Sequence, residues 1–188
     1  MSKEILDEIT KIHTPEDVMK FFDDFIEYGC IDVCEKRWVD SLGGHDFRDI
    51  YRTLSLEDSL DNKIGACFEQ ANISKFVLDT IGIKNRIFCT RGFNEEHKEP
   101  TDLYLVHCYV LGYWGDKIIN IEHSDSDKRG IYVYDLFEDA IRETHNIFSD
   151  KFKLHGASTT RCDEFFDFIP GGLTFVEFND FINESIRQ

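Results

Sequence analysis

The sequence is short of positive charge. Lysine and arginine together number 21, against 37 aspartate and glutamate residues, which gives a formal net charge of −16 over 188 residues. The acidic residues are spread along the chain and form no single block. A surface of this sign repels phosphate backbones and anionic lipid headgroups. The composition therefore argues against nucleic acid and membrane as partners.

Long apolar runs are also missing. The longest uncharged stretch, residues 103–115, is shorter than a membrane-spanning helix and contains His107. No N-terminal segment combines a basic start with an apolar stretch, as a secretory signal would. Six cysteines in a chain of this length make no dense disulfide framework. We expect a soluble, cytoplasmic protein with free thiols.

The apolar content, 41% of the residues, suffices for a sizeable core, and the absence of internal repeats favours one domain over residues 1–188. Helical spacing of apolar residues predicts helices at 5–12, 15–28, 68–81 and 174–182, with Gly29 capping the second. A short capped helix is expected from Ser55, and another helix from Asp135 to about Phe148. Residues 30–52 have no clear period and predict a long loop.

Strand signals fall between the helices, which gives an α+β fold class. Strands are expected at 84–91, 103–111, 116–123 and 130–134, and the second is apolar on both faces. If Trp114 and Gly115 form a two-residue hairpin loop, Tyr113 pairs with Asp116. In this register His107 lies directly opposite Glu122, close enough for a hydrogen bond, and His123 lies opposite Val106 on the other face.

Cys67 is the strongest candidate for a reactive group. It follows a polar, loop-like stretch and opens a helical run. The free N–H groups and positive dipole end of a helix favour thiolate over thiol. His107 and Glu122 complete a Cys, His, carboxylate order. Taken singly, each of the three has a plain structural interpretation: a buried thiol, a core histidine and a charge at a strand end.

Several segments together resemble the transglutaminase-like superfamily. They are KIGACFEQ at 63–70, LDTIGIKNR at 78–86, His107 and INIEHS at 119–124, in the order seen in small bacterial single-domain members. The likeness extends over about residues 14–148, and 149–188 is expected to be a C-terminal extension that packs on this domain. Three positions depart from the family pattern: Glu122 replaces a common Asp, Phe68 a common Trp, and Asp125 a common aromatic.

The resemblance implies a papain-like fold, in which a core helix presents the thiol to an antiparallel sheet. It also implies acyl transfer, with Cys67 as nucleophile, His107 as acid and base, and Glu122 orienting the imidazole. The expected substrate is a peptide or protein amide, or a small amide or thioester. Hydrolysis is favoured over transfer to an amine, and no cofactor is expected.

Other interpretations stay open from the sequence. The second oxyanion donor could be Tyr28, Trp38 or Tyr51, and His123 is a rival base. The residues Cys30, Cys34 and His45 suggest a partial zinc site, although ordinary packing is favoured and no metal is expected. The fold could instead serve as an inactive binding or assembly module. The sequence leaves the oligomeric state open.

Overall fold

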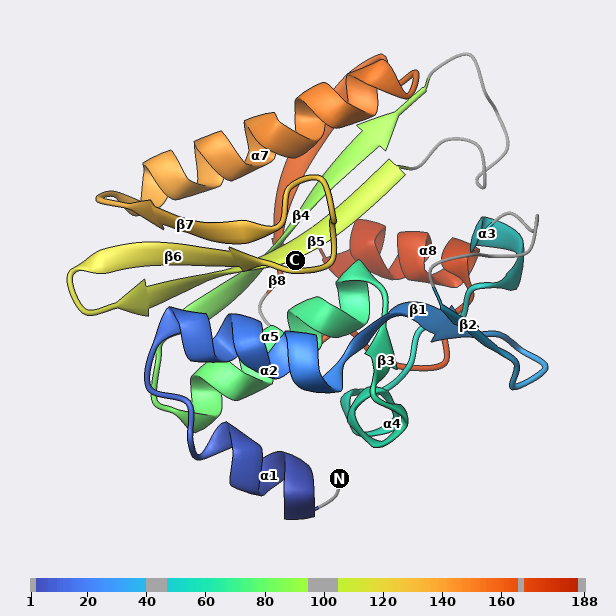
Figure 1. Cartoon of the computed structure of the whole chain (residues 1–188). Helices are drawn as coiled ribbons and strands as arrows, with labels where there is room; N and C mark the ends of the chain where they lie inside the picture. Colours follow the sequence, from blue (N-terminus) through green and yellow to red (C-terminus); the bar gives the residue numbers. More distant parts are fainter. Residues whose placement is uncertain (1–2, 40–46, 95–104, 166–167, 186–188) are drawn as a thin grey trace.

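The fold is organised around a five-stranded antiparallel sheet with helices on both faces, which confirms the α+β class (Figure 1). The computed structural model describes residues 3–39, 47–94, 105–165 and 168–185. The strand order in the sheet is β7-β6-β5-β4-β8. These strands are β4 (Asn85–Phe93), β5 (Leu105–Trp114), β6 (Lys117–Glu122), β7 (Gly130–Tyr134) and β8 (Thr159–Phe165).

One face of the sheet is covered by α5 (Cys67–Thr80) together with α2 (Pro15–Phe25), as Figure 1 shows. The α5 helix is buried on most sides, because its apolar residues are not confined to one stripe. Phe68 on α5 packs on Phe178 of α8 (Phe175–Ser185) with ring centroids 4.1 Å apart. The larger hydrophobic core lies on this side of the sheet and also takes in α1 (Lys3–Ile9).

The other face is covered by α7 (Phe137–Leu154), which lies across the sheet in Figure 1. A second hydrophobic core, containing Phe88, Tyr109 and Phe148, fills the space between α7 and the sheet. The helix was predicted to start at an Asp135 cap and to end near Phe148. It instead has Leu136 at its N-cap and runs to Leu154, because Phe152 also packs into this core.

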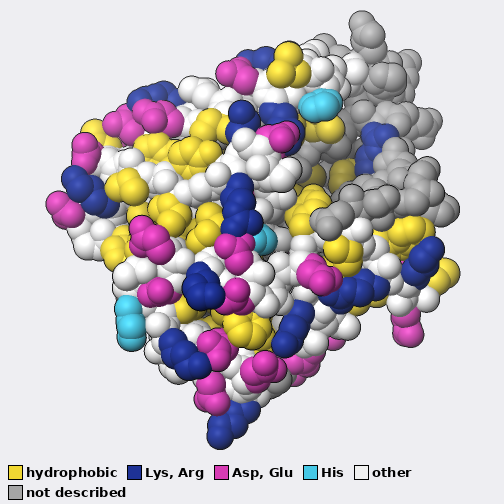
Figure 2. All heavy atoms as spheres, in the orientation of Figure 1, with side chains coloured by type: hydrophobic (Ala, Val, Ile, Leu, Met, Phe, Trp, Pro, Cys, Tyr) yellow, Lys and Arg dark blue, Asp and Glu magenta, His cyan; other side chains and the backbone are white. Residues whose placement is uncertain are grey.

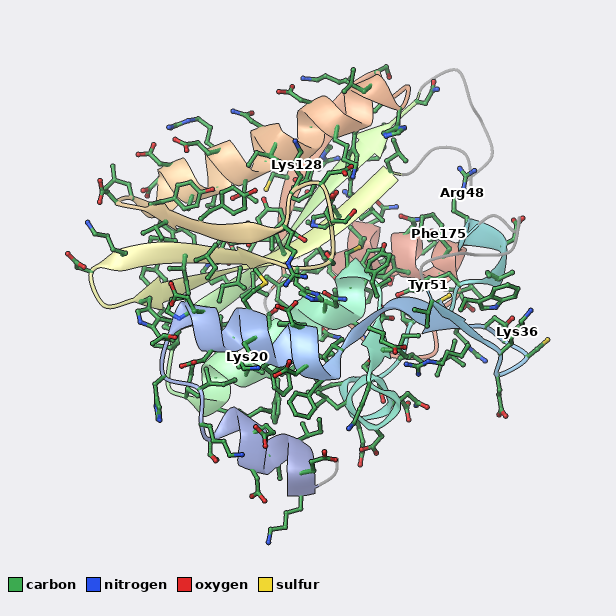
Figure 3. The ribbon with its side chains drawn as sticks, viewed as in Figure 1. Lys20, Lys36, Arg48, Tyr51, Lys128 and Phe175 are labelled. Atoms are coloured by element: carbon green, nitrogen blue, oxygen red, sulfur yellow. The ribbon has the colours of Figure 1, made fainter. Side chains whose placement is uncertain are left out.

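The segment after α2 corrects two predictions. Tyr28 and Gly29 are not at a helix end but in β1 (Glu27–Ile31), and the predicted loop 30–52 contains β2 (Arg37–Val39) and α3 (Phe47–Ile50). Gly29 therefore does not cap a helix. Glycine is required there for another reason: the carbonyl oxygen of Trp38 lies 2.1 Å from where a Cβ would stand. Only glycine permits this approach of β1 to β2. Lys36, over the Trp38 ring, marks the tip of this hairpin in Figure 3.

A short parallel pairing joins β1 to β3 (Ile64–Gly65), the two residues that lead into α5. Tyr28 is the partner of Gly65 in this register. The preceding helix, α4 (Leu56–Asn62), has the predicted Ser55 cap. The chain therefore arrives at Cys67 through a turn fixed on both sides by hydrogen-bonded structure.

The predicted hairpin register is wrong by two residues. The loop is Gly115-Asp116, so that Trp114 pairs with Lys117 and Leu111 with Asn120. Gly115 has φ 63°, the left-handed conformation that such a loop requires. Because side chains alternate with a period of two, a slip of two residues leaves His107 and Glu122 on one face and His123 on the other.

Between residues 105 and 124, pairing of β5 with β6 ends at Leu111 and Asn120. Beyond this point β5 stays paired with β4, and β6 with β7 as far as Glu122. The two strands therefore diverge, and within the described residues the edge of β5 at His107 that faces away from β4 has no strand partner.

The segment 149–172 contains a strand, β8, that was not predicted. It pairs with β4 from Ile87 with Phe165 to Phe93 with Thr159. Its alternation is obscured in the sequence because charged side chains occupy it, among them Asp163, which is buried against Arg91 at 2.8 Å.

The surface carries both signs of charge. Acidic and basic side chains are interspersed over the face shown in Figure 2, and neither forms a continuous patch there. Within the residues that the structure describes, no helix combines the length and apolar character needed to cross a bilayer.

We predict that Gly29→Ala lowers the free energy of unfolding by about 1–3 kcal/mol, because the new methyl group would collide with the Trp38 carbonyl. Urea denaturation provides the measurement. Gly130→Ala is the matched control, because its Cβ would meet only Tyr132 ring atoms, at 3.7 Å or more. Equal midpoints for the two variants would contradict the close β1–β2 approach.

Candidate functional site

Cys67 is the first residue of α5, as the sequence predicted, with Ala66 at the N-cap. The turn is held from within by Glu69, whose Oε2 accepts the Ala66 N–H at 3.0 Å. Its other oxygen, Oε1, accepts the Tyr51 hydroxyl at 2.5 Å and the Leu54 N–H at 3.0 Å. The first N–H groups of a helix, among them that of Cys67, have no acceptor within the helix.

His107 and Glu122 form a buried hydrogen-bonded pair. The imidazole Nε2 lies 2.8 Å from Glu122 Oε2. Glu122 Oε1 accepts two further hydrogen bonds, from the Ser124 hydroxyl and the Asp125 N–H, both at 2.9 Å. Three donors therefore hold the Glu122 carboxylate in one orientation.

The thiol and the imidazole approach each other through the gap between β5 and β6. His107 projects toward α7 and stacks on Phe148, with ring centroids 3.7 Å apart, whereas Cys67 belongs to the helix on the opposite face. Where the strands diverge, the first turns of α5 lie against both of them, and Cys67 Sγ is 3.9 Å from the Val106 carbonyl. The Cys67 side chain is near enough to His107 to raise the pKa of the imidazole.

The surroundings favour a protonated imidazole. Burial lowers the pKa of His107, but the charge and hydrogen bond of Glu122, together with the neighbouring Cys67 thiol, raise it to about 10. The nitrogen Nε2 is taken by Glu122, which leaves Nδ1 for the sulfur.

A surface cleft of about 510 Å³ opens beside the imidazole. Its wall is polar and includes both basic and acidic groups: Tyr28, His107, His123, Ser124, Asp125, Ser126, Arg129 and Lys151. Cys67 is not part of this wall. It is 7% exposed and lines a small adjoining cavity of about 10 Å³ with the diverging strands.

The three aromatic candidates occupy different places. Tyr28 lines the cleft, and its pairing with Gly65 sets it next to the turn before Cys67. Tyr51, labelled in Figure 3, is buried and donates to Glu69. Trp38 donates from Nε1 to Asp32 at 2.8 Å. The structure therefore brings Tyr28 to the cleft, and places Tyr51 behind the turn and Trp38 in the β1–β2 hairpin.

His123 follows β6 directly and packs against α2, whereas His107 stacks on Phe148 of α7, and both side chains line the cleft. The His123 ring stacks on Phe22 of α2 at 5.1 Å between centroids. The nitrogen Nδ1 is 3.0 Å from Gln70 Oε1, and Nε2 is 3.2 Å from Asp23 Oδ1.

Sequence reasoning missed four groups that shape the site: Glu69, Gln70, Phe148 and Lys151. Glu69 and Gln70 are polar residues buried in a helix that is covered on most sides, and this conflict was the available signal. Phe148 and Lys151 come from α7, which no local pattern links to His107. Lys151 Nζ lies 2.5 Å from Asp125 Oδ2, which joins α7 to the loop after Glu122.

Cys30 is buried and Cys34 is exposed, and all six cysteines are free. His45, the third member of the suggested zinc site, lies outside the described residues. In the parts of the chain that are described, no group of three or more His, Cys, Asp or Glu side chains is arranged to hold a metal ion.

The chain matches no family model and no curated protein sequence. Among solved structures it is similar to the (BACCR)NAT3 arylamine N-acetyltransferase from Bacillus cereus, an enzyme reported to have a unique Cys-His-Glu catalytic triad. The match has 12% identity and a TM-score of 0.39, and it covers 65% of this chain and 49% of that chain. Such a likeness assigns neither a family nor an activity to this chain.

We predict that Glu122→Gln lowers the pKa of His107 by about 1–3 pH units, because an amide removes the negative charge while keeping one acceptor. Titration of the imidazole carbon-bound protons by NMR measures this directly. An unchanged His107 titration would show that Glu122 does not control its protonation.

The free energy of unfolding should also depend on pH through His107. Its pKa is about 10 in the folded protein, against 6.5 ordinarily. Its stabilising contribution is therefore complete below pH 6.5 and is lost as the pH rises through about 10. We expect the parent protein to lose more stability than His107→Gln over this interval in urea denaturation. Parallel losses would contradict the raised pKa.

Proposed function

We propose that this protein is a cysteine-nucleophile enzyme of transglutaminase-like type with a papain-like fold, and that it hydrolyses an amide or peptide bond. One observation carries the proposal: the His107 imidazole is hydrogen-bonded to the buried carboxylate of Glu122, with the Cys67 side chain near enough to raise its pKa. The position of Cys67 at a helix N-terminus supports it, since such a position stabilises a thiolate.

In the proposed reaction the Cys67 thiolate attacks the substrate carbonyl and forms a tetrahedral oxyanion. The His107 imidazolium then gives its proton to the leaving amine, and an acyl-enzyme remains. His107, now neutral, takes a proton from the attacking water, which releases the acid and restores the thiolate. Glu122 keeps the ring in the orientation that serves both steps.

The Cys67 backbone N–H is the proposed first donor to the oxyanion, because it has no acceptor within the helix. Tyr28 is the preferred second donor among the three aromatic candidates, since its side chain lines the cleft while its backbone pairs with Gly65. Tyr51 acts behind the turn through Glu69 and not on the substrate.

Water is the proposed acceptor. The cleft beside His107 is open, lined largely by hydroxyl and charged groups, and large enough for several water molecules. A peptide or protein amide, or a small amide or thioester, would place its carbonyl between Tyr28 and His107. A nucleophile that depends on a free thiol also suits a reducing compartment, which supports a cytoplasmic location.

The second candidate function is an inactive binding or assembly module with the same fold. The low exposure of Cys67, 7%, and its position behind the cleft wall favour this alternative. In that case the buried thiol, imidazole and carboxylate would serve only the packing between α5 and the sheet.

Thiol chemistry separates the two functions. An ordinary thiol is only about 1% ionised at pH 6.5, so a thiolate–imidazolium pair can react up to about 100-fold faster. We predict that iodoacetamide at pH 6.5 labels Cys67 at least about tenfold faster than the exposed Cys34, despite the burial of Cys67. His107→Ala should abolish this advantage, and His155→Ala should preserve it. Peptide mass mapping gives the rate at each cysteine.

Acyl transfer itself is tested with S-phenyl thioacetate as an activated acyl donor. We expect an acetyl group on Cys67 in the parent protein, slow release of that group to water, and no adduct in Cys67→Ser. Cys67 that labels no faster than Cys34 and takes no acetyl group would establish the binding module instead.

A further inference from the structure

His123 joins three elements around the site without contributing to the proposed proton transfers. It stands directly after β6, stacks on Phe22 of α2, and contacts Gln70 of α5 through Nδ1. Its other nitrogen faces Asp23 of α2 at 3.2 Å. Both ring nitrogens of His123 lie within hydrogen-bond distance of these two residues.

Gln70 continues this connection toward the nucleophile. Its side chain is buried, and Nε2 donates to the Gly65 carbonyl at 3.0 Å. Gly65 precedes Cys67 by two residues, and the turn is tight, since a Cβ on Gly65 would stand 2.4 Å from that of Glu69. The Gly65 carbonyl orients the next peptide, and through it the start of α5.

The hydrogen bonds constrain the protonation of His123. A carbonyl only accepts, so Gln70 must turn its amide nitrogen to Gly65 and its Oε1 to the imidazole. The Nδ1 nitrogen must then carry a proton to contact Gln70, whereas a contact with the Asp23 carboxylate requires a proton on Nε2. A neutral ring keeps one contact at the expense of the other, and only the imidazolium makes both.

The charged groups that face His123 are Asp23 on α2, Arg129 in the loop after β6, and Glu122 on β6. Burial lowers the pKa of His123, and Arg129 lowers it further, while Asp23 and Glu122 oppose them. Arg129 also donates to Asp23 Oδ1, so Asp23 keeps a partner when the ring is neutral. The complete connection from α2 to Gly65 therefore forms on acidification below pH 6.5.

We propose that His123 is a positioning residue, which acts on Cys67 through Gln70 and the Gly65 carbonyl and holds the start of α5 in its reactive orientation. The expected effect on the reactivity of Cys67 rests on the proposed function. The connection itself is a property of the fold and is tested separately.

The first measurement follows the connection. The amide ¹⁵N shift of Ala66 reports the hydrogen bond on the Gly65 carbonyl. We expect it to titrate with the same midpoint as the His123 ring, below pH 6.5, in the full-length protein. The titration should vanish in Gln70→Ala and in His123→Ala and persist in His155→Ala. An Ala66 resonance that ignores both substitutions would overturn the proposal.

The second measurement tests the effect of the connection on the reactivity of Cys67. At a pH below the midpoint of the His123 titration, where the connection is complete, His123→Ala and Gln70→Ala should each slow iodoacetamide labelling of Cys67 about three- to tenfold, the range expected for loss of one hydrogen bond. Because both act along one connection, the double variant should be no slower than either single variant. Independent structural damage would instead multiply the two effects, and this result would also overturn the proposal. Each variant is compared at equal folded fraction, determined by urea denaturation.

The two hypotheses fail in different ways. If Cys67 of the parent protein labels no faster than Cys34, the proposed function is lost, while the Ala66 titration still decides whether His123 acts on the turn. If the parent protein labels rapidly but the Ala66 resonance is unchanged by Gln70→Ala and by His123→Ala, the enzyme stands and the role of His123 is refuted.

Discussion

The candidate site depends on the divergence of β5 from β6 beyond Leu111 and Asn120. In a continuous sheet the backbone of β6 would occupy the edge of β5, and a thiol on the α5 side could not reach an imidazole on the α7 side. The divergence exposes the β5 edge, and the N-terminus of α5 fills the space. There the Val106 carbonyl of β5 has the Sγ of Cys67, at the start of that helix, 3.9 Å away.

The electrostatics of the site follow from this arrangement. A buried carboxylate is costly unless donors surround it, and Glu122 has three, two of them from the residues that end the strand and begin the next loop. The same burial makes its charge effective on His107. Glu69 repeats the arrangement on the other side of Cys67, with donors from Tyr51, Leu54 and Ala66. Two satisfied carboxylates therefore fix the imidazole and the helix start independently.

Many helices and strands were predicted correctly because the residues that determine them are close together in the sequence. The Thr14-Pro15 start of α2, the Ser55 cap and the strand 130–134 are each determined by residues within one or two turns of one another. The wrong predictions share a cause. Tyr28 and Gly29 continue a helical pattern but pair with Trp38, Val39 and Gly65, and β8 has mixed polarity because Asp163 is neutralised by Arg91. The periodicity of a short segment carries no information about partners that are distant in the sequence.

The sequence alone determined which chemical groups are present and their local setting: a cysteine at a helix start, and a histidine and a glutamate on one face of adjacent strands. The prediction that His107 and Glu122 share a face holds despite the error in register, because side chains return to the same face every two residues. The tertiary structure decided that these groups meet, that Tyr28 and not Tyr51 lines the cleft, and that His123 bears on Gly65 through Gln70. These contacts join segments many residues apart, and their free energy comes from packing that only the complete fold supplies.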